Sequence, residues 1–342
     1  MELLLMSNWT DVQSTPETYV FPPDKRPGKL IFPDCKDIPT IDLEKSEGLE
    51  RAEVIEKIMK ASQEFGFFQV INHGVSQGLM EDTMSVFQEF FGMPAEYKAS
   101  FYSSGTNQSC RIYSSTLNYH KEDFHYWRDN FTQSCHPLED HVQSWPEKPT
   151  RYREVTSTYC VEVRKFLLRI LDLICEGLGL KLGYFEDELT KIQLLSVNHH
   201  IPCPDPSLTL GMPEHCDPNL ISMLHQCAVP GLQLFKDGQW LGVEPVPDAF
   251  IVIAGLQLKV ISNDLFTSPI HRVVTHTKDK RTTIGTFLIP SGDFQIEPAM
   301  ALVDTGNPPV YGAFTYKEFF STFTGKDCDA QSALGCFKKQ LE

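Results

Sequence analysis

The chain has no long apolar run, no Cys-x-x-Cys pair and few basic residues for its size. Its 30 Lys and Arg residues against 45 Asp and Glu residues give a net charge of -15. Neutralising a phosphate backbone needs a basic surface, so we expect no nucleic-acid partner. The most apolar stretch, from Ala249 to Ile261, contains Gln257 and Lys259. It is too short to span a bilayer, so we also expect no membrane partner.

Other common signals are missing as well. The apolar run from Leu3 to Met6 lacks the charged flank and the longer core of a signal peptide. The 10 cysteines are scattered, which in a chain this large favours reduced, mostly buried thiols over a disulfide framework or a zinc ribbon. There is no repeat, low-complexity tract or Gly-rich phosphate loop. Together these absences favour a cytoplasmic protein.

The first half of the chain is predicted to be an arm followed by a mixed α/β region. Residues 1–36 are rich in proline and polar residues, so we expect them to lie over the surface or to be partly disordered. Residues 37–190 contain apolar stripes at helical spacing and the short apolar run FFQVIN, which is typical of a buried strand. A long helix is predicted from about 152 to 176, where GLGL supplies a stop.

The second half has a different sequence pattern, in which short β-like runs are separated by Gly, Pro, Asn and Asp. Many short strands with turn signals between them predict a sandwich or a jelly roll, and we favour the jelly roll. The predicted core spans residues 191–300, and residues 301–342 form a C-terminal segment with a helix over the site. A length of 342 residues allows two domains or one large β domain with helices. The runs are IQLLSVNH, LISMLHQC, GLQLFK, QWLGVEP, AFIVIAG, LKVIS, IHRVVTH, RTTIGTFLIP and FQIEP.

His215 and Asp217 lie two residues apart in MPEHCDPNL. In an extended chain alternate side chains share a face, so these two would point together while Cys216 points away. Two ligands do not hold a metal ion, and a His-x-Asp triplet is common by chance. A metal site therefore needs a third ligand from elsewhere in the chain.

His271, in SPIHRVVTH, is the candidate for that third ligand. Two histidines and one carboxylate on a rigid β scaffold are the facial triad of non-haem Fe(II) oxygenases. Shortly after it, Arg281 and Thr283 are again two residues apart, and a guanidinium with a hydroxyl can hold one end of a dicarboxylate. Each residue alone is more often structural, but the combination in a strand-rich half predicts an iron site.

Several long strings make the chain resemble the plant 2-oxoglutarate- and Fe(II)-dependent dioxygenases over about residues 36 to 325. The resemblance implies a distorted double-stranded β-helix, or jelly-roll, core of the α+β class with flanking helices. It implies His215, Asp217 and His271 as iron ligands, and Arg281 and Thr283 as the grip on the distal carboxylate of 2-oxoglutarate. The strings are FGFFQVINHGV, PCPDPSLTLGMPEHCDPNLISMLHQ, VPGLQLFKDGQW, SPIHRVV and NPPVYGAFTYKEFF.

The family also implies O₂ as a cosubstrate, ascorbate as a reductant, and a role for the stretch NHHIPC. The usual motif there is Asn-Tyr-Tyr-Pro-Pro-Cys, so Asn198 is kept while His199 and His200 replace the tyrosines. One of those tyrosines ordinarily helps to hold the cosubstrate. Because Asn198 and His200 would share a strand face, we expect His200 to take over part of this role and His199 to be a packing or surface residue. An unperturbed imidazole would change its charge near neutral pH.

Strings such as YWRDN and GLQLKVISN resemble the tropane alkaloid hydroxylases within the family. The resemblance implies a small-molecule substrate, an amine or an alkaloid, and a monomer. It places Ser115 where a tropane hydroxylase has a carboxylate near the substrate ammonium, so the substrate could differ. Desaturation or ring closure are alternatives to hydroxylation, and a hormone, phenolic or amino-acid-like substrate or a silent binding protein are alternative functions. The remaining predicted pocket residues are Arg128, Phe287, Leu288 and Phe323.

Overall fold

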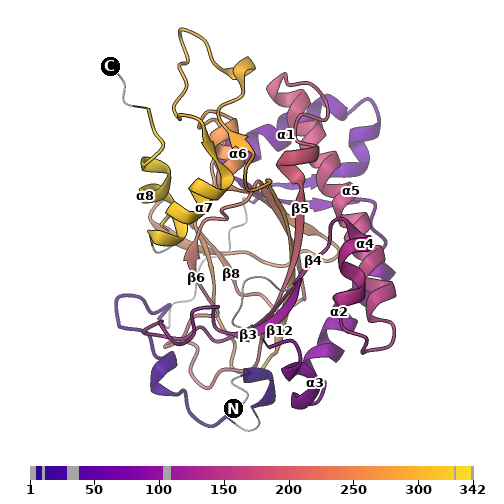
Figure 1. Cartoon of the computed structure of the whole chain (residues 1–342), viewed down its shortest axis with the longest axis vertical. Coiled ribbons are helices and arrows are strands. Elements are labelled where there is room, and N and C mark those ends of the chain that lie inside the picture. Colours follow the sequence, from indigo (N-terminus) through magenta and orange to yellow (C-terminus); the bar gives the residue numbers. More distant parts are fainter. Residues whose placement is uncertain (1–4, 10–11, 29–37, 103–108, 327–328, 340–342) are drawn as a thin grey trace.

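Helices form where apolar residues recur at helical spacing beside a cap. In the computed structural model, which describes residues 5–9, 12–28, 38–102, 109–326 and 329–339 (Figure 1), α1 spans Arg51–Glu64 and buries Val54 and Ile58. Helix α2, Gln77–Phe91, begins after Ser76, whose side chain accepts a hydrogen bond from the Leu79 N–H. The long helix α5 spans Tyr152–Leu178 and ends at Gly179, which has a left-handed φ of 69°. The predicted long helix is therefore confirmed.

The remaining elements are short helices, 3₁₀ helices and strands. The other helices are α3 Ala95–Ala99, α4 Leu138–His141, α6 Leu256–Ile261, α7 Tyr316–Gly325 and α8 Ala330–Gly335. The 3₁₀ helices are η1 Met6–Asn8, η2 Glu17–Tyr19, η3 Leu43–Glu47, η4 Val142–Ser144, η5 Asp187–Thr190 and η6 Met300–Leu302. The strands are β1 Thr40–Asp42, β2 Phe67–Ile71, β3 Cys110–Ser114, β4 Asp129–Ser134, β5 Ile192–His200, β6 Met212–His215, β7 Ile221–Gln226, β8 Leu232–Lys236, β9 Gln239–Gly242, β10 Phe250–Ala254, β11 His271–Val273, β12 Arg281–Ile289, β13 Gln295–Ile296 and β14 Phe314–Thr315. None of these helices is long and apolar enough to cross a membrane.

Two sheets face each other and build the predicted α+β jelly-roll core. The larger sheet has the order β1-β2-β10-β7-β12-β5-β4-β3, and the smaller has the order β6-β11-β8-β9. Side chains from the two sheets meet in an inner cluster, in which Phe67 and Ile251 of the large sheet pack with Leu234 and Val273 of the small one. We call the side of the large sheet that bears Phe67 and Ile251 its inner face.

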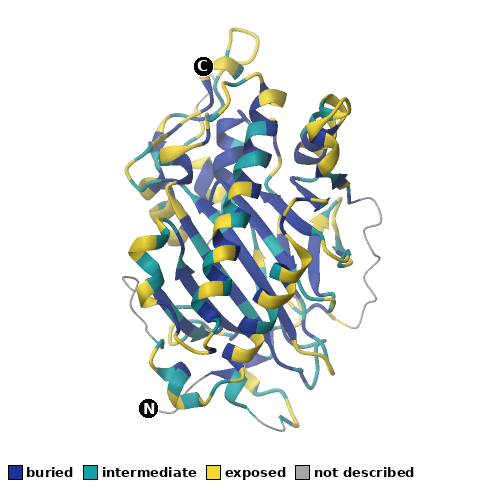
Figure 2. Ribbon diagram, turned by 90° about the vertical axis from the view of Figure 1, so that its right-hand side faces the viewer, coloured by how far each residue is buried: buried dark blue, intermediate teal, exposed yellow. Residues whose placement is uncertain are grey.

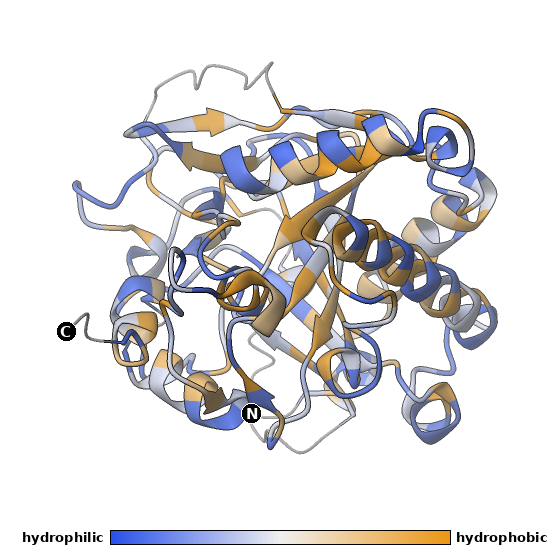
Figure 3. Ribbon diagram, turned by 90° about the horizontal axis from the view of Figure 1, so that it is seen from above, coloured by the Kyte–Doolittle hydropathy of each residue, from blue (hydrophilic) through white to orange (hydrophobic). Residues whose placement is uncertain are grey.

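The outer face of the large sheet carries the main hydrophobic core and is covered by helices. Helices α1, α2 and α5 lie over this face, with their exposed residues turned to solvent and the buried strands behind them (Figure 2). Seen from above, the hydrophobic sides of these helices turn towards the strands (Figure 3). Phe87, Phe90 and Phe131 belong to this core and are fully buried. Helices therefore close one face of the sheet and leave the inner face to build a site.

The large sheet takes strands from both sides of the predicted boundary at residues 190 and 191. Strand β2 pairs in parallel with β1 and antiparallel with β10, and β4 pairs with β5. Both edges of the sheet therefore come from the first half of the chain and its four middle strands come from the second half. The two predicted regions share one sheet and one core.

The described part of the N-terminal arm is packed against the sheet. The backbone N–H groups of Met6 and Ser7 donate to the Asp129 carboxylate at 2.9 and 2.6 Å. Tyr19 makes an edge-to-face contact with Trp127, with ring centroids 5.3 Å apart, and Met6 and Tyr19 are buried. These residues do more than lie over the surface, because their apolar side chains are buried in a small hydrophobic cluster. Residues 1–4, 10–11 and 29–37, which the prediction also covered in large part, lie outside the described residues.

The prediction of a strand at LKVIS is wrong, because α6 occupies these residues. Gly255 turns the chain so closely past Asn219 that the Leu256 N–H donates to the Asp217 carbonyl at 2.8 Å. The residues that follow continue as a short helix, and Leu258 and Val260 are both fully buried. All residues of this helix except Lys259 are buried, and a short apolar run in a buried element does not distinguish a helix from a strand.

Candidate metal centre

His215 and His271 are brought together by the pairing of two short strands. His215 is the last residue of β6 and His271 the first of β11, and their Cα atoms are direct partners across the antiparallel pair. Asp217 lies two residues beyond the end of β6. The expectation that His215 and Asp217 point together because both lie in a strand therefore applies only to His215. The Leu256 N–H holds the Asp217 backbone carbonyl in place. The pairing of β6 with β11 thus holds the two histidines, and a hydrogen bond from α6 holds the backbone at Asp217.

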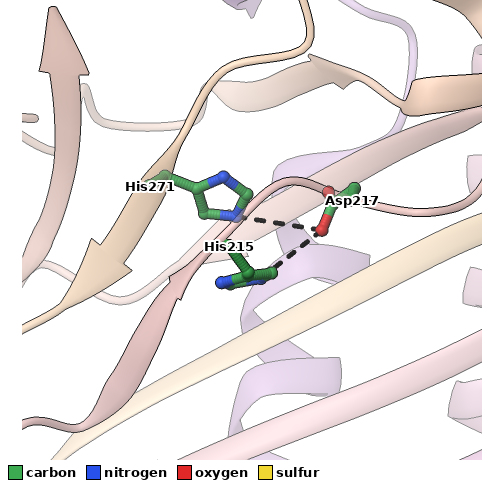
Figure 4. Close-up of side chains that lie close together, drawn as sticks. All are labelled: His215, Asp217 and His271. Atoms are coloured by element: carbon green, nitrogen blue, oxygen red, sulfur yellow. Dashed lines mark ion pairs between the residues drawn. The ribbon is translucent and has the colours of Figure 1, made fainter. Parts of the chain in front are cut away.

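The three side chains converge on one point (Figure 4). The Nε2 atoms of His215 and His271 lie 3.5 and 3.8 Å from Oδ1 of Asp217. Asp217 and His271 are buried, His215 is half-buried, and one ligand atom from each lies within 4.8 Å of the others. Among the described residues, these three side chains are the one group of His, Cys, Asp or Glu residues close enough together to hold a metal ion.

Hydrogen bonds fix which ring nitrogens face this point. Nδ1 of His215 lies 2.9 Å from the Pro213 carbonyl and Nδ1 of His271 lies 3.2 Å from the Pro269 carbonyl. A carbonyl only accepts, so each Nδ1 carries a proton, and in the neutral ring each Nε2 keeps a lone pair that can bind a metal ion at this point. Burial, followed by the charge of His215, lowers the pKa of His271 to about 4.

The acid of this group is ionised at neutral pH. Burial by itself would raise the pKa of Asp217, but the contact with His215 and the positive charge that either histidine carries when protonated lower it to about 2. One carboxylate oxygen and two imidazole lone pairs therefore point to one spot. That donor set fits Fe(II) bound on one face, with further coordination positions left for small ligands.

Gly255 gives a test of how the fold holds Asp217. A Cβ atom at this position would lie 1.9 Å from the Asn219 carbonyl oxygen, so Gly255→Ala must displace the backbone that leads from Asp217. We expect it to lower the free energy of unfolding by about 3 kcal/mol and to weaken Fe(II) retention. Gly78→Ala is the control, because nothing lies within 4 Å of its Cβ position in α2; it should stabilise by about 0.5–1 kcal/mol. Equal urea midpoints for the two variants would contradict the expectation.

Four residues predicted to bind the cosubstrate lie together on the inner face of the large sheet. Strands β12 and β5 pair so that Arg281 is opposite His200 and Thr283 is opposite Asn198. Directly opposed residues of an antiparallel pair project to the same side. The sequence spacing had predicted that members within each pair share a face, and the register joins the two pairs into one group.

Arg281 is buried with only neutral partners. Its Nε donates to the Val229 carbonyl at 3.2 Å and its Nη2 to Oε1 of Gln226 at 2.7 Å. Nη1 is buried and has no hydrogen-bond partner among the described residues. Burial lowers the pKa of Arg281 to about 10, which leaves it charged at neutral pH. A buried charge with a free donor atom is a suitable place for a carboxylate.

The two unusual histidines lie on opposite faces of β5, as predicted. His199 stacks on Phe91 at 4.6 Å on the outer face, and its Nδ1 lies 3.0 Å from Oγ1 of Thr282. His200 is buried on the inner face, with Nδ1 3.3 Å from the Arg281 carbonyl and with a buried Nε2 that has no partner among the described residues.

The expectation that His200 changes its charge near neutral pH is wrong. Burial, followed by the charges of Arg281 and Arg128, holds the pKa of His200 well below its ordinary value. The ring therefore stays neutral, and with its Nδ1 proton directed to the Arg281 carbonyl its Nε2 is an acceptor.

The predicted substrate residues do not all face one space. Arg128 reaches the inner face, where its Nη1 donates to Oδ1 of Asn198 at 2.8 Å. Phe287 shares that face with Arg281 and Thr283 through the alternation of β12, but Leu288 projects to the outer face and is fully buried in the main core. The prediction of Leu288 as a pocket wall is corrected for this reason.

Two further residues have surroundings that the sequence did not indicate. Ser115 is fully buried, with a positive φ of 57°, and its Oγ donates to Oε2 of Glu122 at 2.8 Å. Phe323 of α7 is buried in the main core. Its role at the pocket stays a prediction. Burial, followed by the charge of Asp217, raises the pKa of Tyr316, the first residue of α7. The position of this helix over the site stays a prediction.

Sequence reasoning missed the polar partners of the predicted residues. Gln226 lies opposite Thr283 on β7 and holds Arg281. Glu122 contacts Ser115 from the loop between β3 and β4. A lone Gln in an apolar run or a lone Glu in a polar loop carries no pattern, so only the strand register and the loop path show these contacts.

Comparison with known proteins decides the family. The pattern of the 2OG-Fe(II) oxygenase superfamily matches residues 192–290, and that of the non-haem dioxygenase in morphine synthesis N-terminal region matches residues 38–152. The chain is 45% identical over 344 residues to hyoscyamine 6-dioxygenase of Hyoscyamus niger, which covers 97% of this chain and 98% of that protein. The chain belongs to the 2OG-Fe(II) oxygenase superfamily. It is therefore a dioxygenase that uses Fe(II), 2-oxoglutarate and O₂.

Other members of the superfamily are also similar. The chain is 39% identical to Protein DOWNY MILDEW RESISTANCE 6 of Arabidopsis thaliana, over 94% of this chain and 95% of that one. Among solved structures, JOX2 in complex with 2OG, Fe and JA superposes with a TM-score of 0.84 at 31% identity, over 97% of this chain and 96% of that chain. The superfamily thus includes relatives with different named substrates.

Proposed function

We propose that this dioxygenase hydroxylates a small specialised metabolite, and that the substrate is a tropane-type or other alkaloid amine. The observation that carries this proposal is the 45% identity, over nearly the full length of both chains, to a protein named hyoscyamine 6-dioxygenase. Desaturation and ring closure remain alternative outcomes, because they differ only in how the substrate is held after its first oxidation step. The mass of the product distinguishes the three.

In the proposed site His215, Asp217 and His271 hold the iron. The Pro213 and Pro269 carbonyls orient both rings with Nε2 inward, so the chain presents its donors before the metal binds. Bound iron supplies the oxidation chemistry, in which 2-oxoglutarate is decarboxylated to succinate as O₂ is consumed. The protein positions the reactants and keeps the reacting centre away from bulk water.

Arg281 and Thr283 are proposed to bind the distal carboxylate of 2-oxoglutarate. Arg281 offers a buried charge with a donor that has no partner among the described residues. Asn198 lies beside Thr283 with its Oδ1 accepting from Arg128 and Asn130, so the orientation of its amide is fixed. His200 completes the group as a neutral ring against Arg281.

A second candidate substrate is an acidic hormone or an amino-acid-like molecule. It is favoured by JOX2, whose solved complex contains JA, and by Arg128, a buried cation on the inner face. A catalytically silent binding protein is a third candidate. All three metal donors and Arg281 are present, so we rank it last.

Succinate release tests the proposal. The purified protein is supplied with Fe(II), 2-oxoglutarate, O₂ and ascorbate, together with a panel of tropane amines, other amines and carboxylic acids. We expect succinate formation to rise with tropane amines and a product heavier by one oxygen atom to appear. Stimulation only by carboxylic acids would select the second candidate, and no succinate with any compound would select the silent protein.

The pair His199 and His200 provides a prediction with an internal control. His200→Phe removes the ring nitrogens beside Arg281, so we expect the KM for 2-oxoglutarate to rise about 3- to 10-fold, or more 2-oxoglutarate to be consumed per product. His199→Phe keeps an aromatic ring against Phe91 and should change either quantity by less than about twofold. Succinate and product are measured per 2-oxoglutarate consumed. Equal, near-wild-type kinetics in both variants would show that His200 is only structural.

A further inference from the structure

A cavity of about 610 Å³ lies on the outer face of the large sheet. Strands β5 and β12 contribute His199 and Thr282 to its lining, and these two residues are direct partners across the antiparallel pair. The end of α2 contributes Phe91, and the N-terminal arm contributes Trp9. A volume of this size is within the range of small-molecule sites in proteins. The cavity is therefore large enough to be a second ligand site.

The cavity and the proposed cosubstrate residues lie on opposite faces of the same two strands. Arg281 and His200 are partners that project to the inner face, whereas the next pair along the strands, Thr282 and His199, projects to the outer face. None of the four residues proposed to bind 2-oxoglutarate lines the cavity. One layer of sheet therefore separates the two places, and a ligand in the cavity leaves the cosubstrate residues free.

His199 offers a hydrogen-bond donor to the cavity. The residue is only 6% exposed, its ring stacks on Phe91, and its Nδ1 lies 3.0 Å from Oγ1 of Thr282. Burial, followed by the charges of Lys280 and Lys98, lowers the pKa of His199 to about 3, so the ring is neutral. The Thr282 hydroxyl can donate to Nδ1, which leaves the ring proton on Nε2. That nitrogen has no partner among the described residues, so it is available to an acceptor on a ligand.

The cavity is positively charged in a chain whose net charge is -15. Among the described residues that line it there is no Asp or Glu, and Lys280 is the one charged residue. Lys280 is exposed, and its ammonium has no ion pair or hydrogen bond among the described residues. A second cation lies behind the lining, since buried Lys98 donates to Oγ of Ser7 and to the Phe91 carbonyl, each at 2.7 Å. Both lysines favour an anion in the cavity.

We propose that this cavity binds a small carboxylic acid with a flat apolar body. The carboxylate accepts a hydrogen bond from Nε2 of His199 and pairs with the Lys280 ammonium. The apolar body lies against the side chains of Trp9, Phe91 and Ile201, which line the same cavity. Because the site uses the outer face of β5 and β12, the acid binds together with 2-oxoglutarate and not in its place.

A matched pair of compounds tests the charge of the ligand. Naphthalene-2-carboxylate and naphthalene-2-carboxamide have the same flat body and differ in the charge of the head group. Their affinities for the wild-type protein are measured by calorimetry at low salt and without O₂, with Fe(II) and saturating 2-oxoglutarate bound. We expect the carboxylate to bind about 10-fold more tightly than the amide. Raising the 2-oxoglutarate concentration about tenfold further should leave this affinity unchanged, because ligands at separate sites do not compete.

Three variants locate the site. His199→Phe keeps a ring against Phe91 and loses Nε2, so the affinity for the carboxylate should fall about 10-fold. Lys280→Gln removes an exposed charge, so the affinity for the carboxylate should fall about 3- to 5-fold while that for the amide changes by less than about twofold. Lys278→Gln is the matched control, since Lys278 is an exposed lysine of the same loop that does not line the cavity. It should bind both compounds as the wild-type protein does.

Three results would overturn the inference. The first is a wild-type protein that binds the carboxylate no more tightly than the amide. The second is displacement of the carboxylate by added 2-oxoglutarate, which would place it in the cosubstrate site. Neither measurement depends on a variant folding. The third is an unchanged affinity for the carboxylate in both His199→Phe and Lys280→Gln, with thermal unfolding showing that the two variants are folded.

Discussion

His271→Ala loses Fe(II)-dependent turnover by more than about 100-fold while the protein stays folded. The expectation follows from the convergence of three donors, because removing one leaves two ligands and an open side through which the metal dissociates. His215→Ala and Asp217→Ala should behave alike. Succinate formation measures turnover, bound iron is measured after gel filtration, and thermal unfolding reports whether the fold is kept.

Two further variants sharpen this test. Asp217→Glu keeps the charge but displaces the carboxylate by one methylene, and it should be impaired nearly as strongly, since such sites tolerate misplacement of only about 0.5 Å. His120→Ala removes an exposed histidine and should leave turnover near the wild-type rate. Full activity in any one of the three alanine variants would refute the ligand assignment.

Arg281→Lys raises the KM for 2-oxoglutarate by about 10- to 100-fold and leaves iron binding intact. Lysine keeps the positive charge but loses the planar fork that contacts both carboxylate oxygens. Its ammonium also cannot donate to Val229 and Gln226 in the geometry that now orients the guanidinium. The measurement is succinate formation against cosubstrate concentration, with iron content determined in the same samples.

A cosubstrate that lacks the distal carboxylate isolates the contact. 2-Oxobutanoate keeps the keto acid end and ends in a methyl group, so wild-type protein should discriminate strongly against it. If Arg281 reads the distal carboxylate, Arg281→Lys should reduce this discrimination by the same factor that raises the KM for 2-oxoglutarate. Arg151→Lys, at a surface ion pair, is the control. Unchanged discrimination would mean that another residue holds that end of the cosubstrate.

The grouping of His215, Asp217 and His271 could be predicted in part, because some of these residues lie at short spacings in the sequence. His215 and Asp217 are two residues apart, and Arg281 and Thr283 are two residues apart, so local strand geometry already brings each pair together. The choice of His271 needed a second observation, namely that it lies in a strand-like run that Arg281 and Thr283 follow ten residues later. The pairing of β6 with β11, and of β12 with β5, then brings together residues that are far apart in the sequence.

The substrate side could not be predicted with the same success. Leu288 was placed at the pocket by resemblance, although alternation along β12 sends it to the opposite face from Phe287. Ser115 was considered as a lost carboxylate, and the sequence gives no sign that Glu122, seven residues later, folds back onto it. Loop paths depend on tertiary packing, so no period in the chain records them.

The same reasoning explains the errors at His200 and α6. The charge state of His200 depends on Arg281 and Arg128, which approach from other strands, and not on its neighbours in the chain. The helix at Leu256–Ile261 depends on a turn against Asn219. Both features follow from contacts between distant segments, and local propensity carries no information about either.

The large sheet has edge strands from the first half of the chain and middle strands from the second half, and this order affects folding during synthesis. During synthesis β1 and β2 emerge early, as do β3 and β4, yet the strands that join these two pairs lie between residues 192 and 289. β2 in particular must wait for β10, about 180 residues later, and closing such distant contacts is slow. Until then both early pairs present open strand edges, which are templates for unwanted pairing with other chains. The nascent chain therefore keeps exposed strand edges until most of it has left the ribosome, because its first 190 residues lack the four middle strands of the large sheet.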